Sequence, residues 1–284
     1  METRGRPSQK SEERISFLLD QKRSRVAAFD VGVVFAHPDD ETIGCGAQLA
    51  RWSGACLVLV TDGAPRNLND ARAAGFSTAA EYAEARLEEL KNALRTAGVP
   101  SDSLVRFGIP DQQAARWLVE LTNRLVGIVV TRGLDVLFTH ACEGGHPDHD
   151  AVAFAVHAAA RLLESRGRPV TIVEMPYYRC GANGMDRQQF NSAPDVEEFI
   201  IHLTPDQQIL KRQMVSAHRT QQIALAPFDL SIERFRMAPA YNFSELPSEG
   251  RLLYEHYDWG LTGREWLPLA RSALAELGLD KRSC

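Results

Sequence analysis

The sequence has few cysteines, and they form no recognisable pattern. Its five cysteines are an odd number, and no two of them have the C-x-x-C spacing of a redox or zinc motif. This usage excludes a disulfide framework as the basis of the fold. We therefore expect free thiols in a reducing compartment.

Long apolar runs are also missing. No run approaches the roughly 20 residues that a membrane-spanning helix needs. The first residues are polar and lack the apolar stretch of a signal peptide. We therefore expect a cytoplasmic protein with no membrane span.

Positive charge is not in excess. The 284 residues include 32 Lys and Arg against 37 Asp and Glu, which gives a net charge of −5. Proteins that bind nucleic acids usually present a basic surface, so we predict no nucleic-acid partner.

Two common motifs are also missing. A G-x-S-x-G nucleophile elbow is absent. The pair Gly44-x-Gly46 lacks a third glycine and falls inside a predicted helix, which argues against a dinucleotide site.

What the sequence does contain is a regular alternation of apolar, strand-like segments with helix-like segments. It predicts strands at 31–36, 55–61, 104–107, 135–141 and 170–175, and helices at 41–52, 79–97, 112–131 and 151–165, with a loop at 63–77. This alternation is typical of βαβ units with right-handed crossovers. We therefore predict an α/β fold with a doubly wound, mostly parallel sheet.

The alternation changes beyond residue 180. A strand at 197–203 and a helix at 205–224 are still predicted, and prolines and aromatic residues are frequent after residue 227. No internal repeat or low-complexity linker divides the chain. We expect one domain over 28–284, with a core at about 29–180 and a C-terminal elaboration at about 181–284. Residues 1–27 are expected to be an N-terminal extension, either a short surface helix or a disordered arm.

The first candidate site is the stretch Ala36-His37-Pro38-Asp39-Asp40-Glu41, where the first predicted strand ends. In open α/β sheets, ligands bind at the carboxyl ends of the strands. Consecutive side chains point in different directions. One of the two aspartates can therefore bind a metal ion together with His37, while the other faces the open side of that metal.

The second candidate site is Gly145-His146-Pro147-Asp148-His149, which follows the predicted strand 135–141. A proline at the first helical position places His146 and His149 on one face of the opening turn. If strands 31–36 and 135–141 are neighbours, their ends converge. Two histidines and a carboxylate then form a three-ligand site with open positions, the layout of catalytic zinc and also of non-haem Fe(II).

Together the two motifs resemble those of the LmbE/PIG-L family, metal-dependent N-deacetylases that act on N-acetylglucosaminyl compounds. The alternating segments over about 29–180 are similar to the Rossmann-like fold of that family. The resemblance implies that three residues ligate the metal: His37, Asp40 and His149. It also implies Asp39 as the general base and His146 as the group facing the carbonyl oxygen, with Asp148 orienting it.

A third segment, Arg86-Leu87-Glu88-Glu89, resembles an R-x-x-E segment of the family and implies that Arg86 reaches the substrate. The alternative is that Arg86 and Glu89 form a pair on an exposed face of the helix.

The chain departs from the family pattern at one point. Some members carry a tyrosine shortly before the second motif that helps to polarise the carbonyl, whereas this chain has His140-Ala141-Cys142-Glu143 there. That role is vacant, or it is taken by His140 or another residue.

These observations predict a hydrolase that acts on a linear amide and releases acetate from an N-acetylated amino sugar. A divalent metal would activate water, Asp39 would move the proton, and a cationic His146 would stabilise the oxyanion. We expect Zn²⁺, with Fe²⁺ as the alternative, and the resemblance allows a homo-oligomer. The aromatic residues of the tail are expected to fill the core or a subunit contact rather than to stack on sugars. The competing hypotheses are a metal-dependent hydrolase of another amide or ester and a metal-retaining sugar-binding protein without turnover.

Overall fold

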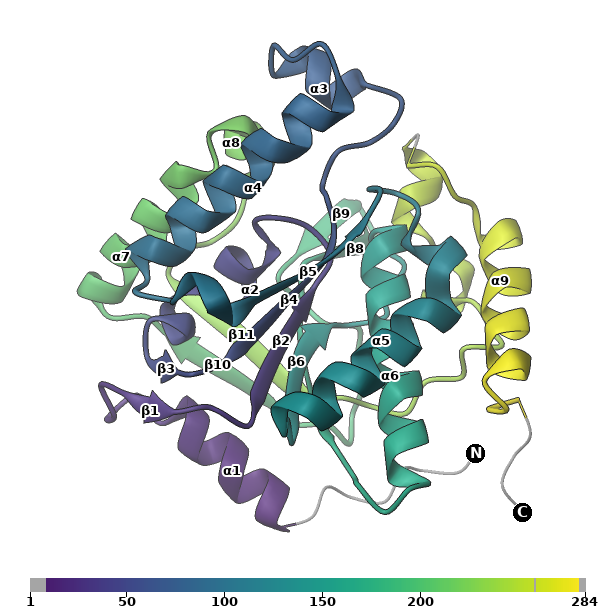
Figure 1. The fold of residues 1–284 in the computed structure, drawn as a ribbon, viewed down its shortest axis with the longest axis horizontal. Coiled ribbons are helices and arrows are strands. Elements are labelled where there is room, and N and C mark those ends of the chain that lie inside the picture. The colour runs from purple at the N-terminus through teal and green to yellow at the C-terminus, as the bar shows by residue number, and fades with distance from the viewer. Residues whose placement is uncertain (1–8, 258, 281–284) are drawn as a thin grey trace.

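The computed structural model describes residues 9–257 and 259–280. Its centre is a seven-stranded sheet with the strand order β10-β11-β7-β6-β2-β4-β5, covered by helices on both faces (Figure 1). The strands are β2 (Val31–Phe35), β4 (Cys56–Thr61), β5 (Leu104–Ile109), β6 (Val136–His140), β7 (Thr171–Met175), β10 (Glu198–His202) and β11 (Ile232–Met237). The predicted α/β fold with a mostly parallel sheet is confirmed.

The most important pairing is that of β2 with β6. The two strands are parallel neighbours, with Val31 opposite Val136 and Val33 opposite Phe138. From β2 the chain continues through β4 and β5 on one side of β2, and later through β6 and β7 on the other side. The β2–β6 boundary is therefore a topological switch point, the place where open α/β sheets bind ligands.

Alternating strand residues build two apolar cores, one on each face of the sheet. In β2, Val34 packs into one core while Val33 and Phe35 pack into the other. The first core includes residues of α5 (Leu118–Arg132), α6 (Pro147–Glu164) and α9 (Gly263–Glu276), and the second lies under α2 (Asp40–Leu49), α4 (Ala79–Thr96) and α7 (Pro205–Ala217). Because helices cover both faces, the central strands are apolar throughout, as the sequence predicted.

Residues 1–8 of the expected N-terminal extension lie outside the described residues, and the extension from residue 9 onward begins with a packed helix. Helix α1 (Gln9–Leu19) buries Ile15 and Leu18 completely. The indole Nε1 of Trp52 donates to the carbonyl oxygen of Leu18 at 3.1 Å. The two-stranded ladder of β1 (Val26–Ala27) with β3 (Trp52–Ser53) joins the same region to the body of the protein.

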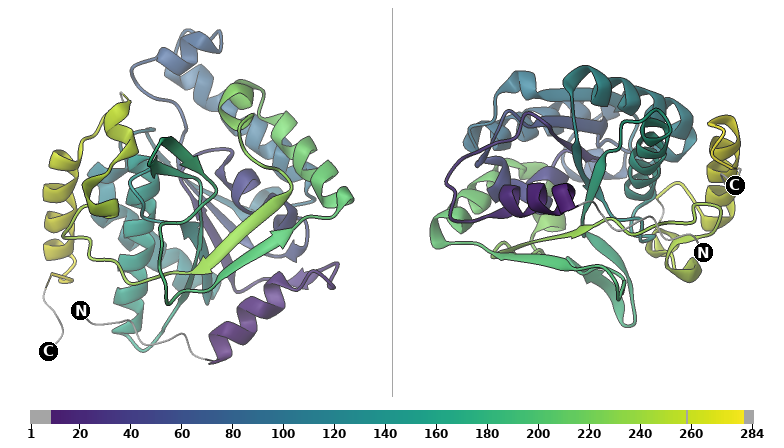
Figure 2. Two further views of the ribbon diagram at one scale, coloured as in Figure 1. Left: turned by 180° about the vertical axis from the view of Figure 1, so that it is seen from behind. Right: turned by 90° about the horizontal axis from the view of Figure 1, so that it is seen from below.

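Three predictions about the elements were wrong in part. The predicted loop 63–77 contains the short helix α3 (Asn69–Ala73), and the predicted helix 205–224 is interrupted after α7 before it resumes as α8 (Gln222–Leu225). The tail also supplies β11, which pairs with both β10 and β7 (Figure 2). This strand was missed because its sequence contains Glu233 and Arg236, yet both of these charged side chains are buried and paired.

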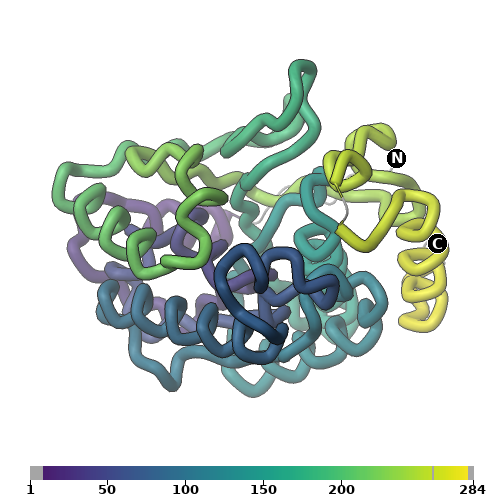
Figure 3. The backbone as a smooth tube through the Cα atoms, turned by 90° about the horizontal axis from the view of Figure 1, so that it is seen from above, coloured from purple at the N-terminus to yellow at the C-terminus, as the bar shows by residue number. Residues whose placement is uncertain are grey.

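After β7 the chain forms the hairpin of β8 (Tyr178–Gly181) and β9 (Gly184–Arg187), which projects from the body of the protein (Figure 3). Among the residues that the structure describes, no helix is long and apolar enough to cross a membrane.

Candidate active site

The two sequence motifs meet where β2 and β6 end. The Nε2 atom of His149 is 3.2 Å from Nδ1 of His37 and 3.3 Å from Oδ1 of Asp40. The Nδ1 atom of His37 is 3.3 Å from Oδ2 of Asp40. All three side chains are buried, so the structure brings the three predicted metal ligands together in one place.

This set of donors fits a divalent cation. One ligand atom from each of His37, Asp40 and His149 lies within 4.8 Å of the others, and two imidazoles with one carboxylate suit Zn²⁺ or Fe²⁺. A second group, made of His37, His146 and Asp148, has the same spacing. A metal-binding histidine usually donates its other N–H to a carboxylate. Because Nε2 of His37 lies 3.3 Å from Asp148, the geometry favours the first group as ligands.

The charges around His37 also favour a bound cation. Burial disfavours the charged form of His37, but Asp111, Asp148 and Asp40 outweigh it and raise the pKa of His37 well above its usual range. Burial acts against ionisation of Asp40 as well, yet His149 and His140 hold the pKa of that carboxyl well below its usual range. The pocket therefore contains an ionised carboxylate in surroundings that attract positive charge.

Asp39 has a backbone conformation that residues with a side chain rarely adopt, with φ 145° and ψ −25°. Its N–H donates to Oε2 of Glu41 at 3.1 Å, and Nη2 of Arg86 donates to its Oδ2 at 2.8 Å. Burial raises the pKa of Asp39 to about 6, although Arg86 opposes this shift. Such local strain is concentrated at functional sites, because the surrounding structure must hold it in place.

Arg86 is one of the buried residues that hold this strained turn. Besides Asp39, its guanidinium donates to the carbonyl oxygens of Pro38 at 3.0 Å and Gly63 at 2.6 Å. Only 5% of Arg86 is exposed, so the alternative of a solvent-exposed pair with Glu89 is wrong. Glu89 instead accepts hydrogen bonds from Thr220.

His146 is held by a backbone contact. Its Nδ1 accepts a hydrogen bond from the N–H of Asp148 at 3.1 Å, so a neutral ring carries its proton on Nε2. Burial and the neighbouring His37 and His149 lower the pKa of His146 well below its usual range. The expectation of a cationic His146 is therefore not met, and the structure instead favours a neutral imidazole with an Nε2–H donor.

The carboxylate of Asp148 contacts groups other than the ring of His146. It accepts hydrogen bonds from the N–H groups of Gln112 at 2.6 Å and Ala114 at 2.9 Å, and it lies beside His37. Asp148 thus contacts His146 through its backbone N–H and contacts His37 through its side chain.

One acidic residue of the site was missed by the sequence analysis. Oδ1 of Asp111 lies 3.2 Å from Nε2 of His37, and its Oδ2 lies 3.9 Å from Nη1 of Arg86. Although burial acts in the opposite direction, His37 holds the pKa of Asp111 well below its usual range. The signal was available, since Asp111 follows the carboxyl end of β5. The predicted strand was ended too early, at residue 107, for this position to be considered.

His140 does not take the vacant tyrosine role. Its Nε2 accepts a hydrogen bond from the N–H of Ala36 at 2.9 Å, and its ring stacks on His149 with centroids 4.0 Å apart. The residue is completely buried, so it cannot face a substrate.

The C-terminal tail contributes an aromatic residue to the site. The ring of Trp259 lies 4.9 Å from that of His146 and 6.0 Å from that of Tyr178, which itself lies 5.2 Å from His149. The expectation that tail aromatics fill the core holds for Tyr254 and Trp266, which are fully buried. It fails for Trp259, and no local pattern around that residue indicated its position.

Comparison with known proteins gives a consistent result. Residues 32–160 match the family model described as "PIG-L: GlcNAc-PI de-N-acetylase". This match covers both motifs and the strands that carry them. None of the curated proteins matches the chain.

Several solved structures have the same fold. The A40926 pseudoaglycone deacetylase Dbv21 is 17% identical with a TM-score of 0.57, and the match covers 78% of this chain and 100% of that one. The zinc-inhibited form of the teicoplanin deacetylase Orf2 is 15% identical with a TM-score of 0.57, covering 75% and 99%. The N,N'-diacetylchitobiose deacetylase of Pyrococcus horikoshii is 19% identical with a TM-score of 0.54, covering 80% and 92%.

Proposed function

We propose that this chain, a member of the PIG-L (LmbE) family and a hydrolytic N-deacetylase, acts with the help of a divalent metal. Its proposed reaction is removal of the acetyl group from an N-acetylglucosamine-containing small molecule. The observation that carries the proposal is the convergence of His37, Asp40 and His149 beside the strained, buried Asp39. This arrangement combines a cation site with a positioned base, the two groups that metal-assisted amide hydrolysis uses.

In this proposal His37, Asp40 and His149 hold the metal, with Zn²⁺ as the first choice and Fe²⁺ as the alternative. When bound, such a cation makes water more acidic and polarises a carbonyl oxygen. Asp148 accepts the Nε2–H of His37 and so keeps Nδ1 of that ring free to bind the cation.

Asp39 is the proposed general base. Arg86 donates a hydrogen bond to its Oδ2, and Asp39 has the strained backbone conformation described above. The ionised Asp39 accepts a proton from the attacking water and then delivers that proton to the amine that leaves. A pKa of about 6 suits this exchange, because a base works best when its pKa is near the working pH.

His146 is the proposed donor to the carbonyl oxygen. As a neutral imidazole it offers Nε2–H, and the hydrogen bond strengthens as negative charge develops on that oxygen. Removing a donor of this kind typically costs about 3–4 kcal/mol of transition-state stabilisation. We therefore expect His146→Ala to slow turnover by roughly two to three orders of magnitude.

Arg86 is the proposed residue that links the base to the substrate. Family resemblance suggests that it reaches the sugar, and its hydrogen bonds to Asp39 and to the carbonyl oxygen of Gly63 support a link with the proposed base.

We also propose one domain over 28–284 with an N-terminal extension over 1–27, a cytoplasmic location, and a homo-oligomer.

The test is acetate release from a panel of N-acetylglucosaminides, other N-acetyl sugars and N-acetyl amino acids, with Zn²⁺, Fe²⁺ or chelator. The expected result is metal-dependent release that prefers N-acetylglucosaminides. Asp39→Asn should abolish release while retaining the bound metal, whereas His149→Ala should lose the metal as well. A preference for acyl amino acids or esters, or full activity of Asp39→Asn, would contradict the proposal.

A further inference from the structure

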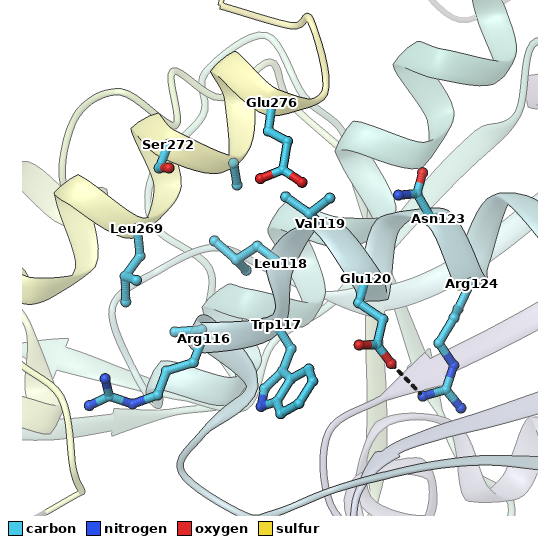
Figure 4. A pocket seen from close by; sticks show the side chains of 12 residues that line it. Arg116, Trp117, Leu118, Val119, Glu120, Asn123, Arg124, Leu269, Ser272 and Glu276 are labelled. Carbon is cyan, nitrogen blue, oxygen red and sulfur yellow. Dashed lines mark hydrogen bonds and ion pairs between the residues drawn. The ribbon is translucent and has the colours of Figure 1, made fainter.

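The C-terminal elaboration packs on both faces of the sheet. On one face, α9 and α5 form a groove of about 690 Å³, whose lining falls within residues 115–124 and 269–276 (Figure 4). These residues lie outside both sequence motifs. On the other face, α7 and the short turn η3 (Arg219–Gln221) after it pack against α2 and α4. The elaboration therefore meets the helix of the first motif through α7.

His218 follows α7 directly and is completely buried beside the first motif. Its Nε2 lies 3.2 Å from Oγ1 of Thr42 and 3.7 Å from Oε1 of Glu41. The side chains of Thr42 and Glu41 are completely buried as well. The three residues thus form a polar cluster between α7 and α2 that has no access to water.

The hydrogen bonds of this cluster run in one direction, toward Asp39. The hydroxyl of Thr42 donates to Oε1 of Glu41. Because a hydroxyl has only one proton to donate, the contact of Thr42 with His218 is a donation from Nε2–H of the ring. Glu41 in turn accepts the N–H of Asp39 on its Oε2 at 3.1 Å. The order of the contacts is therefore His218, Thr42, Glu41 and the backbone of Asp39.

The last of these contacts acts where the backbone is strained. Asp39 has φ 145°, a conformation that a residue with a side chain keeps only when its surroundings hold it. Arg86 of α4 holds the carboxylate of Asp39, and Glu41 holds its N–H. The position of the proposed base thus depends on both contacts.

The segment that carries this histidine is itself fixed to α4. Thr220 donates to Glu89 through its N–H at 3.0 Å and through its hydroxyl at 2.7 Å. The side-chain amide of Gln221 donates to the hydroxyl of Tyr82 at 2.6 Å. Because α4 also carries Arg86, the groups that hold the carboxylate and the N–H of Asp39 are tied to the same helix.

We infer that His218 is a positioning residue for the proposed base, and that it holds Asp39 in place through Thr42 and Glu41. Because His218 is completely buried, it acts through these neighbours and not by contact with the substrate. A displacement of about 1 Å in a reacting group can cost two orders of magnitude in rate. The inference rests on the proposed function, in which Asp39 is the base.

The first test measures acetate release from methyl N-acetylglucosaminide by the full-length, zinc-loaded protein. His218→Leu nearly keeps the volume of the side chain but loses the Nε2–H donor. We expect kcat to fall about 10- to 100-fold, while KM and the affinity for Zn²⁺ stay unchanged. His218→Gln offers an amide N–H in place of Nε2–H and should restore most of the lost kcat.

Thr220→Val is the matched control, because it removes a contact of the same segment with α4 and none with the first motif. It should leave kcat as it is. A fall in kcat of equal size in Thr220→Val and His218→Leu would indicate general loosening of the segment and would overturn the inference.

Thr42→Val supplies an independent variant, because valine has the shape of threonine without the hydroxyl. It should reproduce the loss caused by His218→Leu. The double variant should lose no more than either single variant, since both substitutions break the same series of contacts. Losses that multiply in the double variant, or an unchanged kcat in His218→Leu, would contradict the proposed role of His218.

A measurement without substrate separates this inference from the proposed function. Hydrogen exchange at the N–H of Asp39, followed by NMR, reports its contact with Glu41. Exchange should be faster in His218→Leu and Thr42→Val than in the unsubstituted protein, and unchanged in His218→Gln. If this holds but the unsubstituted protein releases no acetate, the positioning role stands and the proposed function fails. If acetate is released but exchange at Asp39 is equal in all variants, the inference fails and the proposed function stands.

Discussion

At the scale of single residues, the site depends on close contact between chain segments that are far apart in the sequence. Gly145 precedes His146, and the backbone carbonyl of Tyr178 lies against it, in the space that a Cβ atom would occupy. A side chain at position 145 would therefore push the β7–β8 connection away from the second motif.

We predict that Gly145→Ala lowers the free energy of unfolding by about 1–3 kcal/mol, because backbone atoms cannot move aside as the end of a flexible side chain can. Urea unfolding measures the change. The matched control is Gly127→Ala in α5, where no atom lies near the added methyl and where alanine should stabilise the helix by about 0.5–1 kcal/mol. Equal effects of the two substitutions would contradict the packing argument.

Glu143, just before the second motif, makes stability depend on pH. Burial raises the pKa of Glu143 from 4.5 to about 7, although Arg236 opposes the shift. The folded protein therefore binds this proton more tightly than the unfolded chain. The contribution of this proton to the free energy of unfolding is complete below pH 4.5 and is lost as the pH rises to about 7.

We expect Glu143→Gln to reduce the loss of stability between about pH 5 and pH 8, because glutamine does not ionise. Its side-chain oxygen still accepts the hydrogen bond that Glu143 receives from the N–H of Asn191. Urea midpoints at the two pH values provide the measurement, with the exposed Glu164→Gln as the control. An unchanged pH dependence in Glu143→Gln would refute this assignment.

At the scale of elements, a buried ion pair ties the tail to the first motif's helix. Nζ of Lys211 in α7 lies 2.9 Å from Oε1 of Glu233 in β11, and both side chains are fully buried. The same lysine donates to the carbonyl oxygen of Ile43, and Glu233 accepts from the N–H of Ala47. Helix α2 is thereby fixed to α7 and β11 by polar contacts that have no access to water.

Lys211→Met should lower the free energy of unfolding by about 3–5 kcal/mol, because it leaves Glu233 as an unpaired charge in the interior. Adding Glu233→Gln should recover a large part of the loss, since the amide is neutral and still accepts the Ala47 hydrogen bond. A double-mutant cycle in urea measures both effects. If the double variant were no more stable than the single one, the unpaired charge would not be the cause.

The elements differ in how well the sequence predicted them, for a physical reason. Strands β2 and β6 are buried on both faces and are continuous apolar runs, so their positions could be predicted, while their pairing entered the sequence analysis only as a condition. Strand β11 carries Glu233 and Arg236, whose burial depends on partners in other elements. A pattern of hydrophobic residues does not show such a strand, because the compensating charges lie elsewhere in the chain.

The residues of the site likewise divide into those that the sequence predicted and those that it did not. His37, Asp40 and His149 belong to short motifs at strand ends, and the topology of the sheet places them together. Asp111 and Trp259 come from other segments, a turn after β5 and the C-terminal tail. Only the complete fold brings these two residues to the site.

At the scale of the whole molecule, the proposed metal joins the two halves of the sheet. Its ligands follow β2 on one side of the switch point and β6 on the other. A cation that binds only the folded protein adds to stability by mass action, by about 2.7 kcal/mol at a concentration 100 times its dissociation constant.

We therefore predict that Zn²⁺ raises the melting temperature of the chelator-treated protein and that chelator reverses the rise. His149→Ala should abolish this shift, while His157→Ala, on the same helix but outside the donor group, should retain it. Calorimetric scans with and without Zn²⁺ measure the effect. A shift of equal size in His149→Ala would place the ion elsewhere.

The position of β11 has a consequence for shortened forms of the protein. This strand lies between β7 and β10, with Arg236 opposite Glu174 and Phe235 opposite Phe199. A chain that stopped before residue 232 would leave the N–H and C=O groups of β7 unpaired along one side and would detach β10. Such an open strand is a template for pairing with other chains, so truncation should produce aggregates rather than a smaller working enzyme.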